Sequence, residues 1–178
     1  MNGGRVTFQH DYDKSGLYRP NGKHRDEWQS WTETPLLNPK VISLSFARSK
    51  ITDEDLHRLR PQLDVLTTLE ELSLSGTAIS DHGLYALPQL ESLKTLYVNE
   101  THITDNGLAR LTKQTNLRSL YLNQTAVSDF GVAAIADIKS LEVVNLYETK
   151  ISTAGVNALR RSSPQLRIGT PTEGLNWF

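Results

Sequence analysis

The sequence predicts an α/β solenoid, in which short units stack into a right-handed arc with a parallel β-sheet on the concave face and helices on the convex face. Leucines recur at Leu69, Leu93, Leu117 and Leu141, each 24 residues after the one before, and a period of this length is typical of stacked repeats. Within each period, apolar residues first alternate with polar ones, as in a strand with one buried face, and later stand three apart, as on a helix. Each unit is therefore expected to be a strand, a turn and a helix.

Five such units are expected, and places within each are numbered from its first apolar residue. They span residues 41–68, 69–92, 93–116, 117–140 and 141–163. The first unit is longer because it carries a four-residue insertion around Pro61 to Leu66. Places one, four, six, eleven, sixteen and nineteen are apolar in all five units, although only 38% of the chain is hydrophobic. These side chains are predicted to form a continuous core.

Two polar places mark where each helix should begin. Place twelve is always Ser or Thr, and place thirteen is Asp in four units: Asp53, Asp81, Asp105 and Asp129. A hydroxyl caps the free amides of a helix, and a carboxylate in the first turn interacts favourably with the positive end of the helix dipole. We interpret these aspartates as helix-start residues rather than as a row of calcium ligands, and expect the helix to begin at about place thirteen.

Glycine occupies place fifteen in four units, at Gly83, Gly107, Gly131 and Gly155. Glycine inside a helix costs about 1 kcal/mol relative to alanine, so another interaction must offset this cost. We interpret the glycines as points of close approach between stacked units. The first unit has Asp55 at this place, and no regular unit precedes it.

The segment from Leu117 to Val132 resembles a leucine-rich repeat. Where the common form has Asn or Cys at place nine, this chain has Thr77, Thr101, Thr125 and Thr149, which is similar to the threonine-type repeats of bacterial, planctomycete-like proteins. The resemblance covers about two thirds of the chain and implies the solenoid fold, but it leaves the function open because repeat scaffolds serve many partners. The opening from Gly3 to Phe8 also resembles the segment that precedes such repeats, often after an upstream membrane anchor.

Both ends of the chain depart from the repeat and are interpreted as caps. In residues 1–40, Val6 and Phe8 indicate a short strand, and Trp28 and Trp31 are expected to cover the exposed core of the first unit, with a binding role as the alternative. Residues 164–178 form the other end, where a last strand is expected around Leu166 and Ile168. The terminal Trp177 and Phe178 are expected to fold back as a lid, since an exposed pair would be adhesive, and a free tail is the alternative.

Composition excludes several classes of function. The chain has 19 basic and 20 acidic residues, so no large field of one sign favours nucleic acid or an anionic membrane. With no cysteine, disulfides, thiolate metal sites and a cysteine nucleophile are excluded. No apolar stretch is long enough for a membrane span or a signal peptide. The compartment stays open, and a monomer is expected.

No motif for catalysis, metal or cofactor binding is found. The histidines lack the spacing of metal ligands, and the glycine patterns of nucleotide cradles and of the esterase elbow are absent. The histidines are therefore expected on the surface or in turns. The sequence predicts a protein that is not an enzyme and that holds neither cofactor nor metal.

The best candidate site is the face of the sheet that points away from the core. Places five, seven and eight lie there, and the last three units carry tyrosines and amides edged by carboxylates, a mixture similar to an antibody paratope. The hypothetical contact patch consists of Tyr97, Asn99, Glu100, Tyr121, Asn123, Gln124, Asn145, Tyr147 and Glu148. We expect it to bind a protein partner, and its carboxylates favour a basic neighbour. The alternatives are a glycan or cell-wall peptide ligand, an idle solvated sheet, and a structural domain of a larger membrane-anchored protein.

Overall fold

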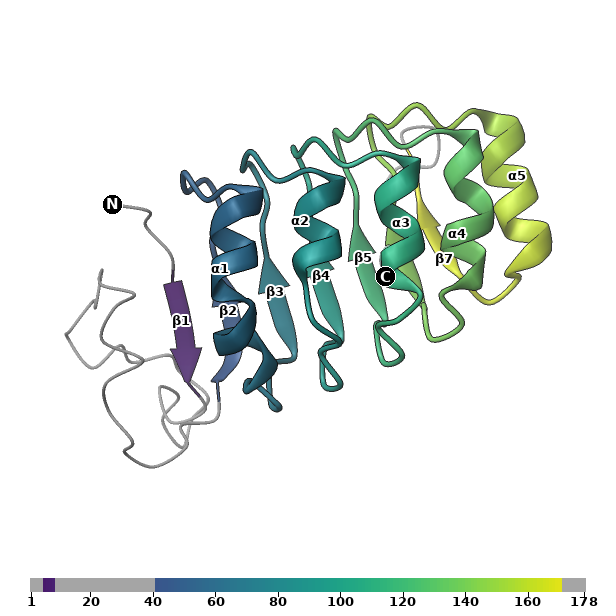
Figure 1. The fold of residues 1–178 in the computed structure, drawn as a ribbon. Coiled ribbons are helices and arrows are strands. Elements are labelled where there is room, and N and C mark those ends of the chain that lie inside the picture. Colours follow the sequence, from purple (N-terminus) through teal and green to yellow (C-terminus); the bar gives the residue numbers. More distant parts are fainter. Residues whose placement is uncertain (1–4, 9–40, 171–178) are drawn as a thin grey trace, which may run out of the picture.

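A computed structural model describes residues 5–8 and 41–170. In this part of the chain, one sheet contains seven strands in chain order; Figure 1 shows the strands from β2 onward behind the helices and β1 at the edge, pointing the opposite way. The strands are β1 (Arg5–Phe8), β2 (Val41–Ser45), β3 (Glu71–Ser73), β4 (Thr95–Tyr97), β5 (Ser119–Tyr121), β6 (Val143–Asn145) and β7 (Arg167–Gly169). Strands β2 to β7 pair in parallel, whereas β1 pairs antiparallel with β2. The expected solenoid is confirmed, together with its flanking strands at Val6 and Ile168.

Helices follow the strands and cover one face of the sheet (Figure 1). They are α1 (Asp53–Asp64), α2 (Asp81–Ala86), α3 (Asp105–Leu111), α4 (Val132–Asp137) and α5 (Thr153–Ser162). A 3₁₀ turn, η3 (Asp129–Gly131), precedes α4. The first helix has 12 residues where α2 has 6, because the insertion after Leu59 extends it past Pro61. None of the helices among the described residues has the length and apolar character that crossing a membrane requires.

The predicted core side chains lie between the sheet and the helices. All of them are buried except Leu59, Val132, Leu141 and Ile151, which are partly buried against the same cluster. The core also takes in Leu63, Leu90, Ile138 and Leu166, which the repeat pattern did not include.

Hydroxyl groups cap α1, α2, α3 and α5 and, in the fourth unit, the 3₁₀ turn η3 that precedes α4, as predicted for place twelve. The place-twelve side chains of Thr52, Ser80, Thr104, Ser128 and Ser152 each accept a hydrogen bond from a backbone amide of the following turn. In the first unit, Asp55 completes a reciprocal capping box with Thr52. Four helices therefore begin at place thirteen, because a side chain satisfies one of their free amides, whereas in the fourth unit η3 begins there and α4 follows at Val132.

The place-thirteen aspartates also join one unit to the next. Asp53 accepts hydrogen bonds from both the backbone N–H of Ser80 (2.8 Å) and its hydroxyl (2.5 Å). Asp81, Asp105 and Asp129 do the same with the place-twelve residues Thr104, Ser128 and Ser152. We call this set of four carboxylates the aspartate ladder. The interpretation as helix-start residues is correct but incomplete, since each carboxylate also holds the next unit in place.

The aspartate ladder explains the glycines at place fifteen. A Cβ atom added at Gly107 would collide with the carboxylate of Asp81, whose Cγ would lie 3.1 Å away. The same carboxylate contact, from the preceding unit, would meet a Cβ at Gly83, Gly131 and Gly155. The predicted close approach between units is confirmed, and its partner is a carboxylate rather than packed aliphatic groups alone.

The turn between strand and helix uses local hydrogen bonds. Each place-nine threonine donates its hydroxyl proton to the carbonyl of place six in its own unit, at 2.6 Å for Thr77 and 2.9 Å for Thr149. Place eight, immediately before it, has a left-handed backbone in every unit: Arg48, Gly76, Glu100, Gln124 and Glu148 have φ angles between 54° and 66°. A non-glycine residue in this region is strained. The turn therefore holds four such residues at the end of the strands.

Candidate functional site

The candidate site is the open sheet face, defined as the side of the sheet opposite the helices. Its central feature is the pair Tyr97 and Tyr121, which are register partners on β4 and β5. Their rings stack with centroids 4.5 Å apart and planes 17° from parallel. Adjacent strands are about 4.8 Å apart, so the strand pairing itself sets the stacking distance. Both tyrosines are half-buried, which leaves part of each ring available for contact.

The environment of Tyr97 favours its neutral hydroxyl. Burial raises the pKa of Tyr97 most, and the nearby Tyr121 and Glu71 raise it further, because a tyrosinate would be desolvated and close to negative charge. At neutral pH the phenol therefore remains a hydrogen-bond donor.

The asparagines at place seven are tied to the sheet. Asn99 donates an amide N–H to the hydroxyl of Ser75 (3.3 Å), and its Oδ1 accepts the backbone N–H of Asn123 (3.0 Å). Both asparagines are half-buried. The side-chain amide of Asn99 is thus positioned by contacts with both neighbouring units, whereas the buried Oδ1 of Asn123 has no hydrogen-bond partner among the described residues.

Place eight forms a rim at the carboxyl ends of the strands. Glu100, Gln124 and Glu148 are exposed, and Gln124 donates from Nε2 to Glu148 Oε2 at 2.6 Å. Tyr147 lies between the rim and the sheet and is half-buried. These residues extend the stacked tyrosines into one surface that spans β4 to β6.

Asn145 differs from the other predicted contact residues. It is only 5% exposed, and its Oδ1 accepts the backbone N–H of Tyr147 at 3.1 Å. Val143, on the same face of β6, is likewise buried. In this structure Asn145 therefore supports Tyr147 and presents little surface of its own, so we leave it out of the contact patch proposed below.

Two functional or structural residues were not among the predicted ones. Glu71 lies at place three of β3, on the open sheet face, and is exposed. The strand alternation that selected places five and seven also includes place three, so the signal was present. Gln114 is 1% exposed at a place where the neighbouring units have Leu90 and Ile138. It accepts the N–H of Leu90 (2.9 Å) and donates to the carbonyl of Pro88 (2.7 Å).

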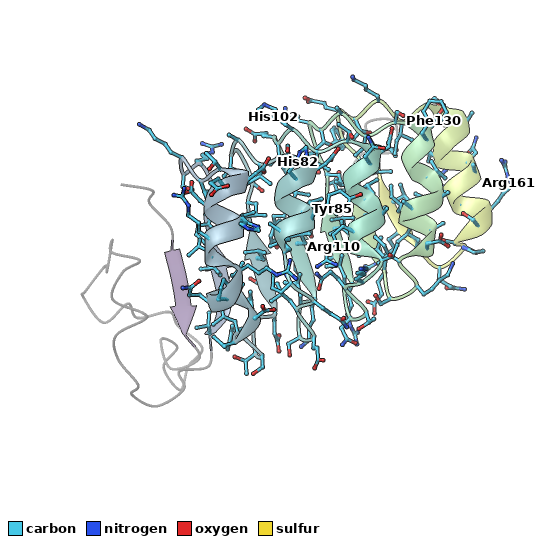
Figure 2. The ribbon with its side chains drawn as sticks, viewed as in Figure 1. His82, Tyr85, His102, Arg110, Phe130 and Arg161 are labelled. Atoms are coloured by element: carbon cyan, nitrogen blue, oxygen red, sulfur yellow. The ribbon has the colours of Figure 1, made fainter. Side chains whose placement is uncertain are left out.

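The helix side presents a different surface. Figure 2 shows Tyr85 and Arg110 on the helices, and His82, His102 and Phe130 towards the edge where strands turn into helices. Phe130 is 91% exposed, and the Tyr85 hydroxyl donates to the Asn106 carbonyl at 3.1 Å. These two aromatic side chains do not belong to the open sheet face, and Tyr85 provides a matched control for the tyrosines there.

Metal chemistry has no geometric basis in the part of the chain that the structure describes. Within residues 5–8 and 41–170, no three His, Asp or Glu side chains form a group that could hold a metal ion. The three described histidines, His57, His82 and His102, are exposed. The predicted roles of Trp28, Trp31, Trp177 and Phe178 lie outside the described residues.

Comparison with known proteins identifies the repeat. A family model described as "Leucine Rich repeat" matches residues 65–87 and 89–111, and the same 24-residue period and strand–helix geometry continue on both sides of that region. The matched segments are leucine-rich repeats, and the chain has the solenoid fold that such repeats form. No curated protein matches its sequence.

Solved structures share the leucine-rich-repeat fold. The chain is similar to an internalin from Listeria monocytogenes strain 4b F2365, with a TM-score of 0.56, 24% identity, and coverage of 72% of this chain and 34% of the internalin. It thus spans about a third of that protein. Matches with lower scores include internalin C2 from the same strain (TM-score 0.44, 20% identity, 72% of this chain and 70% of that one). A leucine-rich-repeat protein from Leptospira interrogans also matches (TM-score 0.46, 16% identity, 71% of this chain and 36% of that one).

Proposed function

We propose that this leucine-rich-repeat chain is a non-catalytic recognition module, monomeric on its own, that binds a protein partner on the open sheet face. Stacked repeats create extended surfaces of the kind that solenoid proteins use for binding. The observation that carries the proposal is the Tyr97–Tyr121 stack, held at 4.5 Å by the pairing of β4 and β5. The proposed contact patch is Tyr97, Asn99, Glu100, Tyr121, Asn123, Gln124, Tyr147 and Glu148.

Pre-organisation supports a binding role for this patch. Ordering a flexible side chain on binding costs about 0.5–1.5 kcal/mol, and tyrosine offers a large amphipathic contact area with only two side-chain torsions to fix. Here the rings restrain each other, and the amide of Asn99 is already bonded to neighbouring units. A partner would therefore meet a surface that loses little freedom on binding.

The stack also favours protein over glycan as the ligand. Tyr97 and Tyr121 each cover one face of the other, so a sugar ring that packs on an aromatic side chain could use only the outer face of either ring. Ring edges, hydroxyls and amides remain at the surface, and these groups suit the mixed polar and apolar surface of a protein.

Affinity capture tests the proposal. The full chain is immobilised, exposed to an extract, and the bound proteins are quantified by mass spectrometry for the wild type, Tyr97→Ala, Tyr121→Ala and the control Tyr85→Ala. We expect each variant on the open sheet face to weaken capture of the same proteins by about 2 kcal/mol or more, as for hot-spot tyrosines, while Tyr85→Ala captures normally. Circular dichroism confirms that every variant is folded.

Two results would overturn the proposal. Equal capture by the wild type and by the Tyr97→Ala/Tyr121→Ala double variant would remove the site. Binding on a glycan array that these substitutions abolish, without any captured protein, would replace the protein partner with a carbohydrate ligand.

A further inference from the structure

One ring face of Tyr97 has no aromatic neighbour among residues 41–170. The opposite face lies against Tyr121, but on the β3 side the register partner of Tyr97 is Ser73, which has a small side chain. The face that looks towards β3 is therefore not covered by a second ring, and Tyr97 remains half-buried rather than buried. A planar group of suitable size could continue the stack at this point.

A carboxylate borders the same position. Glu71 lies two residues before Ser73 on β3, so both side chains are on the open sheet face. The side chain of Glu71 is exposed, and its register partner on β4 is Thr95, two residues before Tyr97, so Glu71 is a diagonal neighbour of Tyr97 on the same face. The carboxylate and the free ring face therefore lie close enough for one ligand group to contact both.

At the open-face and rim places of the units from β3 to β6, the charges are of one sign. At places three, five, seven and eight of the units from β3 to β6, the charged residues are Glu71, Glu100 and Glu148, with no Lys or Arg. A basic residue of the preceding unit, Arg48, lies over Gly76, where its Cγ would be 3.1 Å from an added Cβ. Gly76 is at the opposite end of β3 from Glu71, so Arg48 does not neutralise this position.

We infer that the open sheet face receives an arginine side chain of the partner, with the guanidinium stacked on the free face of Tyr97 and paired with the carboxylate of Glu71. This inference rests on the proposed function. Arginine fits better than lysine because its guanidinium is planar, stacks on aromatic rings, and binds a carboxylate through two parallel hydrogen bonds. The partner is thus a protein with an arginine at the centre of its contact surface.

A direct test uses N-acetyl-arginine methylamide as the probe, titrated into the isotopically labelled full chain and followed by NMR. Saturable shifts are expected at the amides of Ser73 and Tyr97 and at the Tyr97 ring. The neutral isostere N-acetyl-citrulline methylamide should give no saturable shift, and the lysine analogue should bind more weakly.

Variants locate the site. Tyr97→Leu and Glu71→Gln should each raise the half-saturating concentration about threefold to tenfold, the range of a partly exposed cation–π contact or ion pair. Tyr97→Phe, which keeps the ring, should bind like the wild type. Arg48→Gln should leave binding unchanged or strengthen it, because it removes a positive charge. Equal binding of citrulline, or half-saturation within twofold of the wild type for both Tyr97→Leu and Glu71→Gln, would overturn the inference.

The affinity-capture experiment, repeated with Glu71→Gln, distinguishes failure of this inference from failure of the proposed function on which it rests. If Tyr121→Ala abolishes capture while Glu71→Gln does not change it, the recognition surface stands and the arginine assignment fails. If neither variant changes capture, the proposed function fails as well. Loss of capture with Glu71→Gln, together with the arginine-specific shifts, supports both.

Discussion

The carboxylate of Asp81 accepts two hydrogen bonds from Thr104, a residue of the next repeat, from its backbone N–H at 2.8 Å and from its hydroxyl at 2.6 Å. Because a hydrogen bond to a charged group contributes about 1.5–3 kcal/mol, Asp81→Ala should lower the free energy of unfolding by about 2–3 kcal/mol. Urea denaturation measures the change. As the control, Asp137→Ala removes an exposed carboxylate that pairs only with Lys139, and it should change the stability by less than about 1 kcal/mol. Equal effects of the two substitutions would contradict the role of the aspartate ladder.

The effect on stability of replacing the glycine at place fifteen should depend on the carboxylate of the preceding unit. In the wild type, Gly107→Ala should destabilise the chain, because the new Cβ collides with the carboxylate of Asp81. In an Asp81→Ala background the collision is gone, and alanine regains its helix advantage of about 1 kcal/mol. A double-mutant cycle by urea denaturation should therefore show coupling of at least about 1 kcal/mol between the two positions. Additive effects would show that the glycine is selected for another reason.

Acid should weaken the last bond of the aspartate ladder. The Ser152 hydroxyl, and then its backbone N–H, lower the pKa of Asp129 below its ordinary value of 3.8. Since the folded pKa lies below the unfolded one, the carboxylate contributes stability above about pH 4, and this contribution is lost as the pH falls through the lowered pKa. Urea unfolding at a series of pH values should thus show a steeper loss of stability below pH 4 for the wild type than for Asp129→Asn. Parallel curves would contradict the assignment.

The buried side-chain amide of Gln114 should contribute to the stability of the chain, although the neighbouring units have apolar residues at the same place. Gln114→Leu fills the space of the side chain but leaves the Leu90 N–H and the Pro88 carbonyl without their partner. The free energy of unfolding should fall by about 1–3 kcal/mol, the cost of unsatisfied buried polar groups. Thermal and urea melts measure it, with the exposed Thr115→Ala as the control. A stabilised Gln114→Leu variant would mean that apolar packing outweighs the two hydrogen bonds.

Substitutions at place eight should change the melting temperature in opposite directions in two units, because the backbone there is left-handed. Glu100 has a φ of 54° and Gly76 a φ of 66°, and a left-handed conformation costs a non-glycine residue roughly 1–2 kcal/mol. Glu100→Gly should therefore raise the melting temperature, although greater freedom of the unfolded chain offsets part of the gain. Gly76→Ala should lower it. Changes of the same sign at both positions would show that backbone conformation does not dominate this place.

The sequence predicted the strands, the helices and the hydroxyl groups at the helix starts because each leaves a local signal. Alternation at Leu96 and Val98, and the hydroxyl of Thr104 before a helix, are sufficient to locate these elements. The second role of Asp81 could not be predicted in this way, because helix-start chemistry already accounts for a carboxylate at that place. Its bond to Thr104 depends on how two units are offset in space, which the pattern of one unit does not contain.

The sequence also predicted part of the candidate site, namely which residues share one face of the sheet. Strand alternation places Tyr97 and Tyr121 on one face, and a common repeat length makes them neighbours. It does not indicate how much of each residue remains exposed, so Asn145 could not be distinguished from Asn123 before the structure was known. The same alternation places Glu71 on this face, at place three of its unit.

The separation of the two faces has a consequence for how such a chain can change over generations. The aspartate ladder, the place-nine threonines and the aliphatic spine all act behind the sheet or within its turns, whereas places five and seven contribute few of these bonds. Natural variation can therefore exchange the residues at Tyr97 or Tyr147, and with them the contacts proposed for this face, while the scaffold inherited from one lineage to the next keeps its shape.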